Sequence, residues 1–422
     1  MNVSCDFIFL ITLVFIFLRP WNLSLWIISL IGAFFVYIFK LVNWQDIIFI
    51  FDLVWGSSLT LLALMILSFV LEILGFFDFI AIKILAYSKN KNEKIATKKL
   101  MFFLLIFVFF LTAFLGNDGA ILIITPIVIA IFSTFKNLNE SMIVNTFLLS
   151  VSFLCDASSN TLVISNLTNL ITANYFNLDF LEFTKSMFLP SLFVLLSTLF
   201  VVCFIFLRSL PRDLEIKISQ EVKISTPFFL FCICYLILFV FSFFIAQIYH
   251  WDKSLIALCE SLFLWFIAYK IKKREALSVV KHAPWGIFIF SFGLYIVVFA
   301  LHKCGVGEIL SNLYQNFEHN RINSIMGTGF VSALLSSIFN NLPMTLIGDL
   351  ALKDFSKDMI YAHLLGVNIG SKLTPIGSLA TLFWLELIAK RGIRISFLQY
   401  CKFSFFITLI VLFFSFLGLI LK

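Results

Sequence analysis

Residues 141–175 read SMIVNTFLLSVSFLCDASSNTLVISNLTNLITANY, an apolar run that is interrupted by the polar segment Asp156–Thr161. A helix that crosses a bilayer needs about 20 mostly apolar residues. Backbone that leaves the helix at membrane depth is tolerated only where it is buried in protein or lines a water-filled cavity. The stretch therefore predicts a broken membrane helix with a polar break near its middle.

Three further apolar stretches are interrupted in the same way. Residues 359–388 contain GVNIGSK at 366–372, and residues 322–351 contain NNLP at 340–343. Residues 100–135 consist of two short apolar arms that meet at GNDG, 116–119. We interpret 359–388 as a second broken helix, and 100–135 and 322–351 as re-entrant hairpins with polar tips.

The composition assigns the whole chain to the membrane. Of 422 residues, 61% are hydrophobic and 13% are charged, whereas soluble domains have roughly 45–50% apolar and about 25% charged residues. This balance excludes a soluble enzyme, a disordered chain and a nucleic-acid-binding protein. The eight cysteines and five histidines show no metal-binding spacing, so we expect no metal and no cofactor.

The basic residues predict which loops lie on the cytoplasmic side. They cluster at 83–99, 208–223, 270–281 and 390–402. All four clusters lie on one side if about ten helices cross the bilayer and each hairpin returns to the side it left. The fold class is thus an all-α polytopic protein of the inner membrane of a prokaryote, with both termini outside.

The order of elements predicts two inverted repeats, because each half contains a hairpin followed by a broken helix. The first repeat is 1–208, with hairpin 100–135 and broken helix 141–175. A cytoplasmic linker, 209–225, joins it to the second repeat, 226–422, with hairpin 322–351 and broken helix 359–388. Paired discontinuous helices are typical of secondary transporters, whose site lies where the repeats meet.

Two carboxylates in the breaks are the sharpest candidates for function. Asp118 lies at the first hairpin tip and Asp156 in the first helix break. A carboxylate at membrane depth is costly, which makes each a candidate proton carrier. Their structural alternative is to cap a half-helix or to pair with Lys372, the one basic residue in a break. If Asp156 couples transport to protons, alanine or asparagine there should abolish gradient-driven transport.

The other polar residues of the four breaks are suited to hydrogen-bond a small hydroxylated substrate, or else to satisfy broken backbone. The candidate substrate-binding residues are Asn117, Thr125, Ser159, Asn160, Asn340, Asn341, Asn368, Lys372 and Thr374. Gly366–Lys372 lacks the spacing of a phosphate-binding loop, so we expect no ATP site.

A few ionisable residues outside the breaks carry less weight. Glu260, Asp349 and Glu386 are single acids on apolar helices, which we expect near the membrane interfaces. The histidines form no cluster, and His363, close to the second break, is the one that merits substitution.

At these motifs the chain resembles the arsenite efflux pumps of the ArsB type, within the ion-transporter superfamily. The resemblance lies in GNDGAILIITPIVIAIF (116–132), DASSNTLVISNLTNLITANYF (156–176), HAPWGIFIFSFGLYIVVFAL (282–301), GTGFVSALLSSIFNNLP (327–343) and KLTPIGSLATLFWL (372–385). The chain departs from the family pattern at Ser371, where proline is expected, and at Glu260 and Asp349, where small or apolar residues are expected.

The resemblance implies export of arsenite and antimonite, as neutral trihydroxides, in exchange for protons, and hence arsenical resistance. It also implies that a soluble ATPase subunit joins the pump in some relatives. The match marks Asn117, Asp118, Thr125, Asp156, Asn340, Asn341, Lys372 and Thr374 as signature positions.

Other functions stay open at this point. Ser159-Asn160-Thr161 resembles the Ser-Asn-Thr motif of sodium-coupled anion (carboxylate-type) symporters of the same superfamily. A membrane-embedded enzyme has no supporting His-Glu-x-x-His or Gly-x-Ser-x-Gly motif. The acids in paired breaks argue against a passive channel or a scaffold subunit, because neither requires them.

Overall fold

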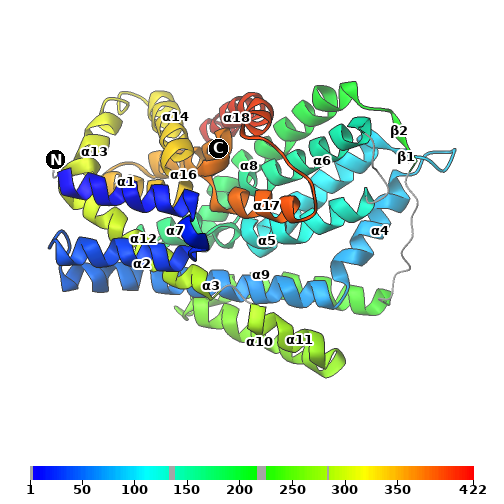
Figure 1. Ribbon diagram of the computed structural model, residues 1–422, viewed down its shortest axis with the longest axis horizontal. Coiled ribbons are helices and arrows are strands. Elements are labelled where there is room, and N and C mark those ends of the chain that lie inside the picture. Colours follow the sequence, from blue (N-terminus) through cyan, green and yellow to red (C-terminus); the bar gives the residue numbers. More distant parts are fainter. Residues whose placement is uncertain (1–2, 133–137, 216–224, 283–284) are drawn as a thin grey trace.

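The computed structural model describes residues 3–132, 138–215, 225–282 and 285–422, nearly all of them in helices (Figure 1). The first half contains α1 (Val3–Leu18), α2 (Leu25–Ile38), α3 (Trp44–Ile73), α4 (Phe76–Ser88), β1 (Ile95–Ala96), α5 (Thr97–Ile131), α6 (Leu138–Ala157), α7 (Leu167–Tyr175), α8 (Phe180–Phe204) and β2 (Asp213–Leu214). The second half contains α9 (Thr226–Ile248), α10 (Lys253–Ile271), α11 (Lys273–His282), α12 (Gly286–Leu301), α13 (Gly307–Gln315), α14 (Arg321–Phe339), α15 (Asn341–Ala351), α16 (Lys357–Gly370), α17 (Leu379–Lys390) and α18 (Phe397–Ile420).

The helices confirm an all-α polytopic membrane protein. Within the described ranges, eight helices are long and apolar enough to cross a bilayer, and three apolar helices are shorter. Side chains cap some of the helix starts: the Asn43 side chain accepts from the backbone N–H of Asp46, and the Ser396 side chain from that of Gln399. Such caps satisfy N–H groups that the first helical turn leaves unpaired. The total of about ten crossings stays a prediction.

Two hydrophobic cores lie on either side of the molecule's middle. One is built chiefly from α5, α6, α8 and α18, and the other from α1, α2, α12 and α15. Figure 1 shows α5 and α6 extending to the right and α1, α2 and α12 at the left, with α17 and α18 near the middle and α3 running beneath. The broken elements meet between the cores, so the polar breaks are enclosed by apolar helices.

The closest helix contact of the second half depends on small residues. A Cβ on Gly366 of α16 would lie 2.2 Å from the carbonyl oxygen of Gly329 on α14, and one on Gly370 would lie 2.3 Å from the Cα of Ala333. Small residues spaced four apart let membrane helices approach backbone to backbone. This contact fixes α16, and with it the second break, against the hairpin helix α14.

The tips of the two predicted hairpins share one backbone conformation. Gly116 interrupts α5 at φ 77° and ψ 160°, and Asn340 separates α14 from α15 at φ 80° and ψ 152°. Positive φ combined with an extended ψ is easy for glycine and strained for a residue with a Cβ. Asn340 is held there because its side chain donates to the carbonyl of Ile376 at 3.0 Å and accepts from the N–H of Leu342 at 3.2 Å.

Ion pairs between different loops agree with the predicted sidedness. On the face assigned to the cytoplasm, Arg19 pairs with Glu386 and Lys94 with Glu215. On the opposite face the described pairs are Lys303–Asp46, Arg321–Asp358, Lys357–Glu182 and Lys422–Asp358. None of these pairs joins a loop assigned inside to one assigned outside, so the order of crossings is internally consistent.

A short antiparallel pair of strands, β1 and β2, ties the loop before α5 to the segment after α8. The predicted linker 209–225 lies largely outside the described residues, as do residues 133–135 of the predicted hairpin. The division into repeats at 208 and 226 therefore stays a prediction.

Candidate functional site

The two helix breaks repeat one sequence of backbone conformations. In the first, Leu162 is extended (φ −128°, ψ 160°), a 3-10 turn follows at Val163–Ser165, and extended Asn166 precedes α7. In the second, Thr374 is extended (φ −132°, ψ 154°), a 3-10 turn follows at Pro375–Gly377, and extended Ser378 precedes α17. The matching order and spacing place Asp156 in register with Asn368, and Asn160 in register with Lys372.

A buried ion pair joins the two breaks. The Nζ of Lys372 lies 2.6 Å from Oδ2 of Asp156, and both side chains are almost completely buried, at 0% and 2% exposure. Lys372 also donates to Thr381 Oγ1 at 2.6 Å, and Asn117 Nδ2 donates to Asp156 Oδ1 at 2.9 Å. The pair thus connects the first hairpin tip, both breaks and the start of α17 in one charge-neutral unit.

Asn368 makes the corresponding contact from the other break. Its Nδ2 donates to Asn160 Oδ1 at 2.8 Å and to Asn169 Oδ1 at 3.0 Å. Its Oδ1 accepts from Thr168 Oγ1 at 2.8 Å and from Asn166 Nδ2 at 3.3 Å. The register above makes Asn368–Asn160 the counterpart of Asp156–Lys372, so one contact is an ion pair and the other a pair of neutral amides.

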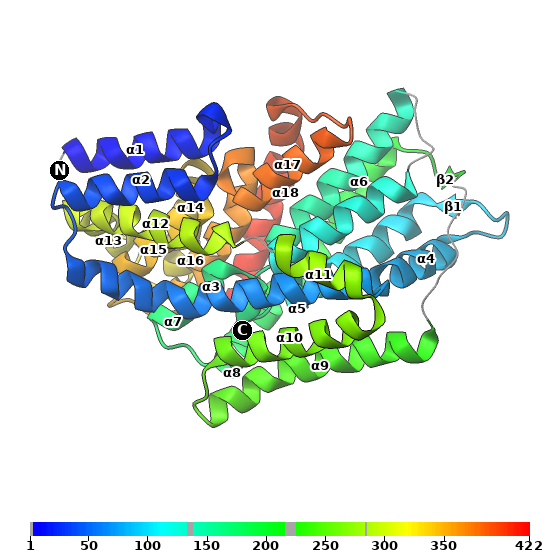
Figure 2. The same cartoon turned by 60° about the horizontal axis from the view of Figure 1, so that its bottom comes forward.

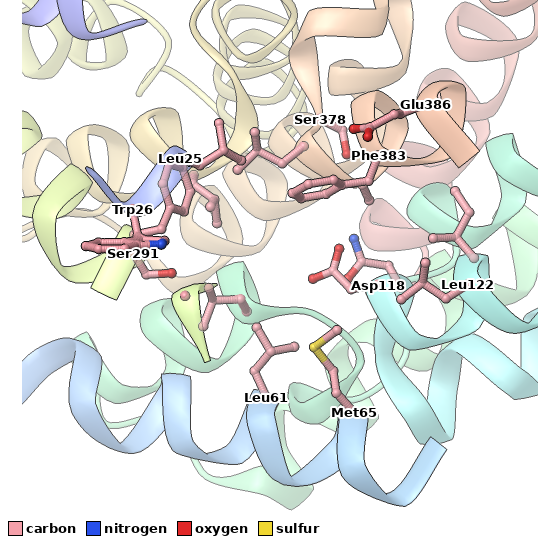
Figure 3. A pocket seen from close by; sticks show the side chains of 18 of the residues that line it. Leu25, Trp26, Leu61, Met65, Asp118, Leu122, Ser291, Ser378, Phe383 and Glu386 are labelled. Carbon is pink, nitrogen blue, oxygen red and sulfur yellow. The ribbon is translucent and has the colours of Figure 1, made fainter. Parts of the chain in front are cut away.

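A pocket of about 890 Å³ lies beside this network. Its inner wall is formed by Asp118 with Asn117, Asn166, Asn341 and Ser378, and Leu61 and Met65 of α3 close its floor (Figure 3). Its outer part is lined by Arg19, Glu386 and Lys390, which are partly or largely exposed. The pocket therefore opens on the face assigned to the cytoplasm.

Asp118 directs its carboxylate into this pocket, as Figure 3 shows. The residue lies in the first turn of the second arm of α5, just after the Gly116 break, where the helix N-terminus favours a negative charge. Asn117 Oδ1 and Ser378 Oγ, on the same wall, are buried without a hydrogen-bond partner among the described residues. The wall thus offers a carboxylate, amides and a hydroxyl to a hydroxylated ligand.

The structure brings together most of the predicted site residues. Asn117, Asp118 and Asn341 line the pocket, while Asp156, Ser159, Asn160, Asn368 and Lys372 form the network behind it. Three others bond to backbone and do not line the pocket: Thr125 donates to Ile121, Thr374 to Ser337 and Asn340 to Ile376. Their roles as substrate ligands stay predictions.

Sequence reasoning missed several polar residues of the site. Asn166 lines the pocket, Asn169 and Thr168 hold Asn368, and Thr381 holds Lys372. Asn166 precedes a half-helix, and a polar residue just before an apolar run is the usual signal of a helix start.

One expectation about the ionisable residues outside the breaks needs correction. Asp349 was expected near a membrane interface, but it is completely buried and lies 4.0 Å from His363. Glu386 does lie at the surface, paired with Arg19 and Lys390. Among the described residues, no group of His, Cys, Asp and Glu is arranged to hold a metal ion.

Comparison with known proteins covers nearly the whole chain. The model of the arsenical pump membrane protein family, ArsB, matches residues 4–422. The arsenical pump membrane protein of Escherichia coli (strain K12) is 30% identical over 426 residues, which cover 98% of this chain and 97% of that protein.

Other bacteria also have similar proteins. The putative arsenical pump membrane protein of Bacillus subtilis (strain 168) is 30% identical over 426 residues, covering 93% of each chain. The 46 kDa membrane protein of Mycobacterium leprae (strain TN) is 26% identical over 411 residues, covering 90% of each.

Proposed function

Because the chain belongs to the arsenical pump membrane protein family, we propose that it exports arsenite and antimonite from the cytoplasm in exchange for protons. The observation that carries this proposal is the Asp118 carboxylate, which faces a pocket beside two broken helices. A protein of this family is a multi-pass transporter of the bacterial inner membrane and not an enzyme.

The pocket suits a small neutral trihydroxide. Such a cargo both donates and accepts hydrogen bonds, and the pocket wall supplies Asp118, the free Oδ1 of Asn117 and the free hydroxyl of Ser378. No described cluster of thiols lines the pocket. Hydrogen bonds release their ligand more readily than a cage of three thiolates would, and a pump must release its cargo.

We assign the exchanged proton to Asp118. Ionised Asp118 accepts hydrogen bonds from cargo hydroxyls in the state that is open to the cytoplasm. When the site faces outward, an incoming proton forms an O–H bond on the carboxylate and removes that acceptor, so the cargo leaves. The carrier returns with the proton and releases it to cytoplasmic water. Each cycle thus exchanges a proton for a cargo molecule.

Asp156 has a different role in this scheme, although the sequence proposes both acids as proton carriers. Lys372 lies 2.6 Å from its carboxylate and Asn117 donates to its other oxygen. Lys372 is thereby provided with a counter-ion, and removal of either partner would leave the other charge buried and unpaired. We propose that Asp156 and Lys372 hold the two breaks together, and that Asp118 titrates beside them.

The sodium-coupled anion symporter is the weaker alternative. The charged side chain on the inner wall of the pocket is a carboxylate, which repels an anionic substrate. Any ATP-driven mode would need the soluble ATPase subunit that the family resemblance implies, because the chain has no phosphate-binding loop.

Arsenite uptake into everted membrane vesicles tests the proposal. With an acidic interior and no sodium, we expect uptake above the outside concentration, and an uncoupler should collapse it. Asp118→Asn should lose this uphill uptake and keep arsenite exchange down its gradient. Glu260→Gln is the matched control, because Glu260 lies on α10, outside the pocket.

Sodium-dependent carboxylate uptake without arsenite transport would favour the symporter. Uphill arsenite uptake by Asp118→Asn would remove Asp118 from the coupling role.

A further inference from the structure

A second buried acid, Asp349, lies opposite an imidazole away from the central pocket. It belongs to α15 and faces His363 of α16, with both side chains at 0% exposure and 4.0 Å between Oδ1 and Nε2. Neither residue lines the pocket. Figures 1 and 2 place the surrounding helices α13, α14 and α16 together at the end of the molecule that holds the N-terminus.

The hydrogen bonds around His363 indicate which of its two ring nitrogens carries a hydrogen. Ser332 donates its hydroxyl hydrogen to the carbonyl of Thr328 at 2.6 Å, so its oxygen can only accept from other groups. We therefore assign His363 Nδ1, which lies 2.8 Å from that oxygen, as a donor to it. In the same assignment the Tyr314 hydroxyl, at 2.9 Å, also donates to it. A neutral imidazole in this orientation has a bare lone pair on Nε2.

That lone pair would face only acceptors. Nε2 lies 3.4 Å from the carbonyl oxygen of Thr345 and 4.0 Å from Asp349 Oδ1. Asp349 Oδ2 accepts from Thr172 Oγ1 at 2.7 Å, whereas Oδ1 has no hydrogen-bond partner among the described residues. A lone pair on Nε2 that faces only oxygen lone pairs is unfavourable. The buried Asp349 carboxylate, which has no compensating positive charge, adds a second penalty. One added proton, on Nε2 or on Oδ1, removes the conflict in either position.

We propose that Asp349 and His363 together form a proton-binding site that fastens α15 to α16. The proton resides on Nε2, where the N–H points at the Thr345 carbonyl and the imidazolium charge faces the carboxylate, or on Oδ1, where it neutralises the acid opposite the imidazole. Loss of the proton leaves a buried negative charge opposite a lone pair and pushes the two helices apart.

The packing around the pair supports a built site. A Cβ on Gly348 would lie 2.0 Å from Cε1 of the imidazole, so the glycine lets the ring lie against α15. The other titratable groups that face Asp349 are tyrosines: Tyr314 from α13, Tyr295 from α12 and Tyr175 from α7. Among the described residues, no lysine or arginine pairs with Asp349, and α14 contributes only the Ser332 hydroxyl.

The site is connected to the central network through α7. Thr172, which donates to Asp349, lies one turn after Thr168, which donates to Asn368. Helix α15 itself begins at Asn341 and Leu342, which line the pocket. Release of the proton would therefore free a helix that forms part of the pocket wall. This consequence for transport rests on the proposed function, whereas proton binding by the pair does not.

The pH dependence of thermal unfolding of the purified full-length protein tests proton binding without any cargo. Above about pH 6.5 a free imidazole in the unfolded chain is neutral. A proton retained by the folded pair then stabilises the fold, and this stabilisation is lost as the pH rises further. We expect the wild-type melting temperature to fall by several degrees between about pH 6.5 and about pH 9.

Asp349→Asn supplies a permanent donor to Nε2 and should flatten this pH dependence. His363→Gln, whose amide donates to Oδ1, should flatten it too and serves if the first variant does not fold. Glu275→Gln, on α11, should keep the wild-type slope, because the Glu275 side chain is 57% exposed and lies far along the chain from the pair. A wild-type slope in either folded variant of the pair would overturn the proposal.

If neither variant folds, infrared spectra and ¹⁵N-histidine spectra of the wild type decide. A change in one carboxyl or one imidazole proton across this pH range supports the site, and no change in either group overturns it. The vesicle assays with arsenite test the proposed transport function separately, so proton binding by the pair and arsenite export can each be refuted on its own.

Discussion

Replacing Lys372 by methionine tests the buried ion pair most directly. Methionine is close to lysine in length and apolar, so it fills the same space without the charge. Asp156 would keep its hydrogen bond from Asn117 and lose its counter-ion. Breaking a buried pair by removing one partner costs about 3–5 kcal/mol, because the remaining charge is left uncompensated. We expect Lys372→Met to destabilise the protein by that amount.

The double variant Asp156→Asn with Lys372→Met separates this cause from a packing defect. With both charges gone, the asparagine still accepts from Asn117, and we expect a loss of only about 1 kcal/mol, since a neutral hydrogen bond is worth about that much. Either single substitution should cost about 3–5 kcal/mol, so the coupling energy between the two positions should be several kcal/mol, above the usual range for residues in contact.

Unfolding in detergent micelles, by denaturant or heat, measures the stability of the four proteins in this double-mutant cycle: the wild type, the two single variants and the double variant. Lys390→Met is the matched control, because Lys390 is 71% exposed and pairs with Glu386 on the same helix. Exposed pairs of this kind contribute only about 0.3–0.5 kcal/mol. A loss below about 1 kcal/mol for Lys372→Met, or strictly additive effects in the double variant, would refute the account of a buried pair.

Three further predictions concern packing, the pocket mouth and a hairpin tip. Gly366→Ala should sharply lower the yield of folded protein, since the new Cβ would lie 2.2 Å from a backbone oxygen. Gly56→Ala is the control, because no atom lies nearer than 3.8 Å to its Cβ, and it should not lower the yield. Size-exclusion profiles measure the folded fraction of both variants. Arg19→Ala should change the unfolding free energy by less than about 1 kcal/mol, because its pair with Glu386 is partly exposed; denaturant unfolding measures this. Asn340→Ala should cost about 1–2 kcal/mol in the same assay, as it removes a cap and places alanine at φ 80°.

The sequence located the breaks, because an interruption of an apolar run is visible in one dimension. Asp118 and Asp156 could be named for the same reason, since a carboxylate at membrane depth is rare and costly. The partner of Lys372 could not be chosen between these two acids. That choice depends on how two breaks, far apart in the chain, approach each other, and the structure gives 2.6 Å to Asp156.

Asp349 and His363 show the other limit of sequence reasoning. They occupy different helices, and each is a single ionisable residue in an apolar surround. Their pairing depends on the close approach of α15 and α16 at Gly348. Thr125 and Thr374 illustrate the converse: polar residues beside a break whose hydroxyls the structure uses to satisfy backbone carbonyls.

The register between the two breaks explains why a single free charge remains in the pocket. Asp156 and Lys372 occupy non-equivalent positions, and their counterparts are the amides Asn368 and Asn160, so the central contact contains one charge of each sign and is neutral. At the hairpin tips the same comparison places Asp118 opposite Leu342, and both line the pocket. On the inner wall of the pocket the net charge is therefore set by Asp118, whereas Arg19, Glu386 and Lys390 line the outer part. A neutral cargo needs no counter-charge, so protonation of Asp118 is free to act as the coupling step, whereas an anionic cargo would require a cation that the inner wall of the pocket does not provide.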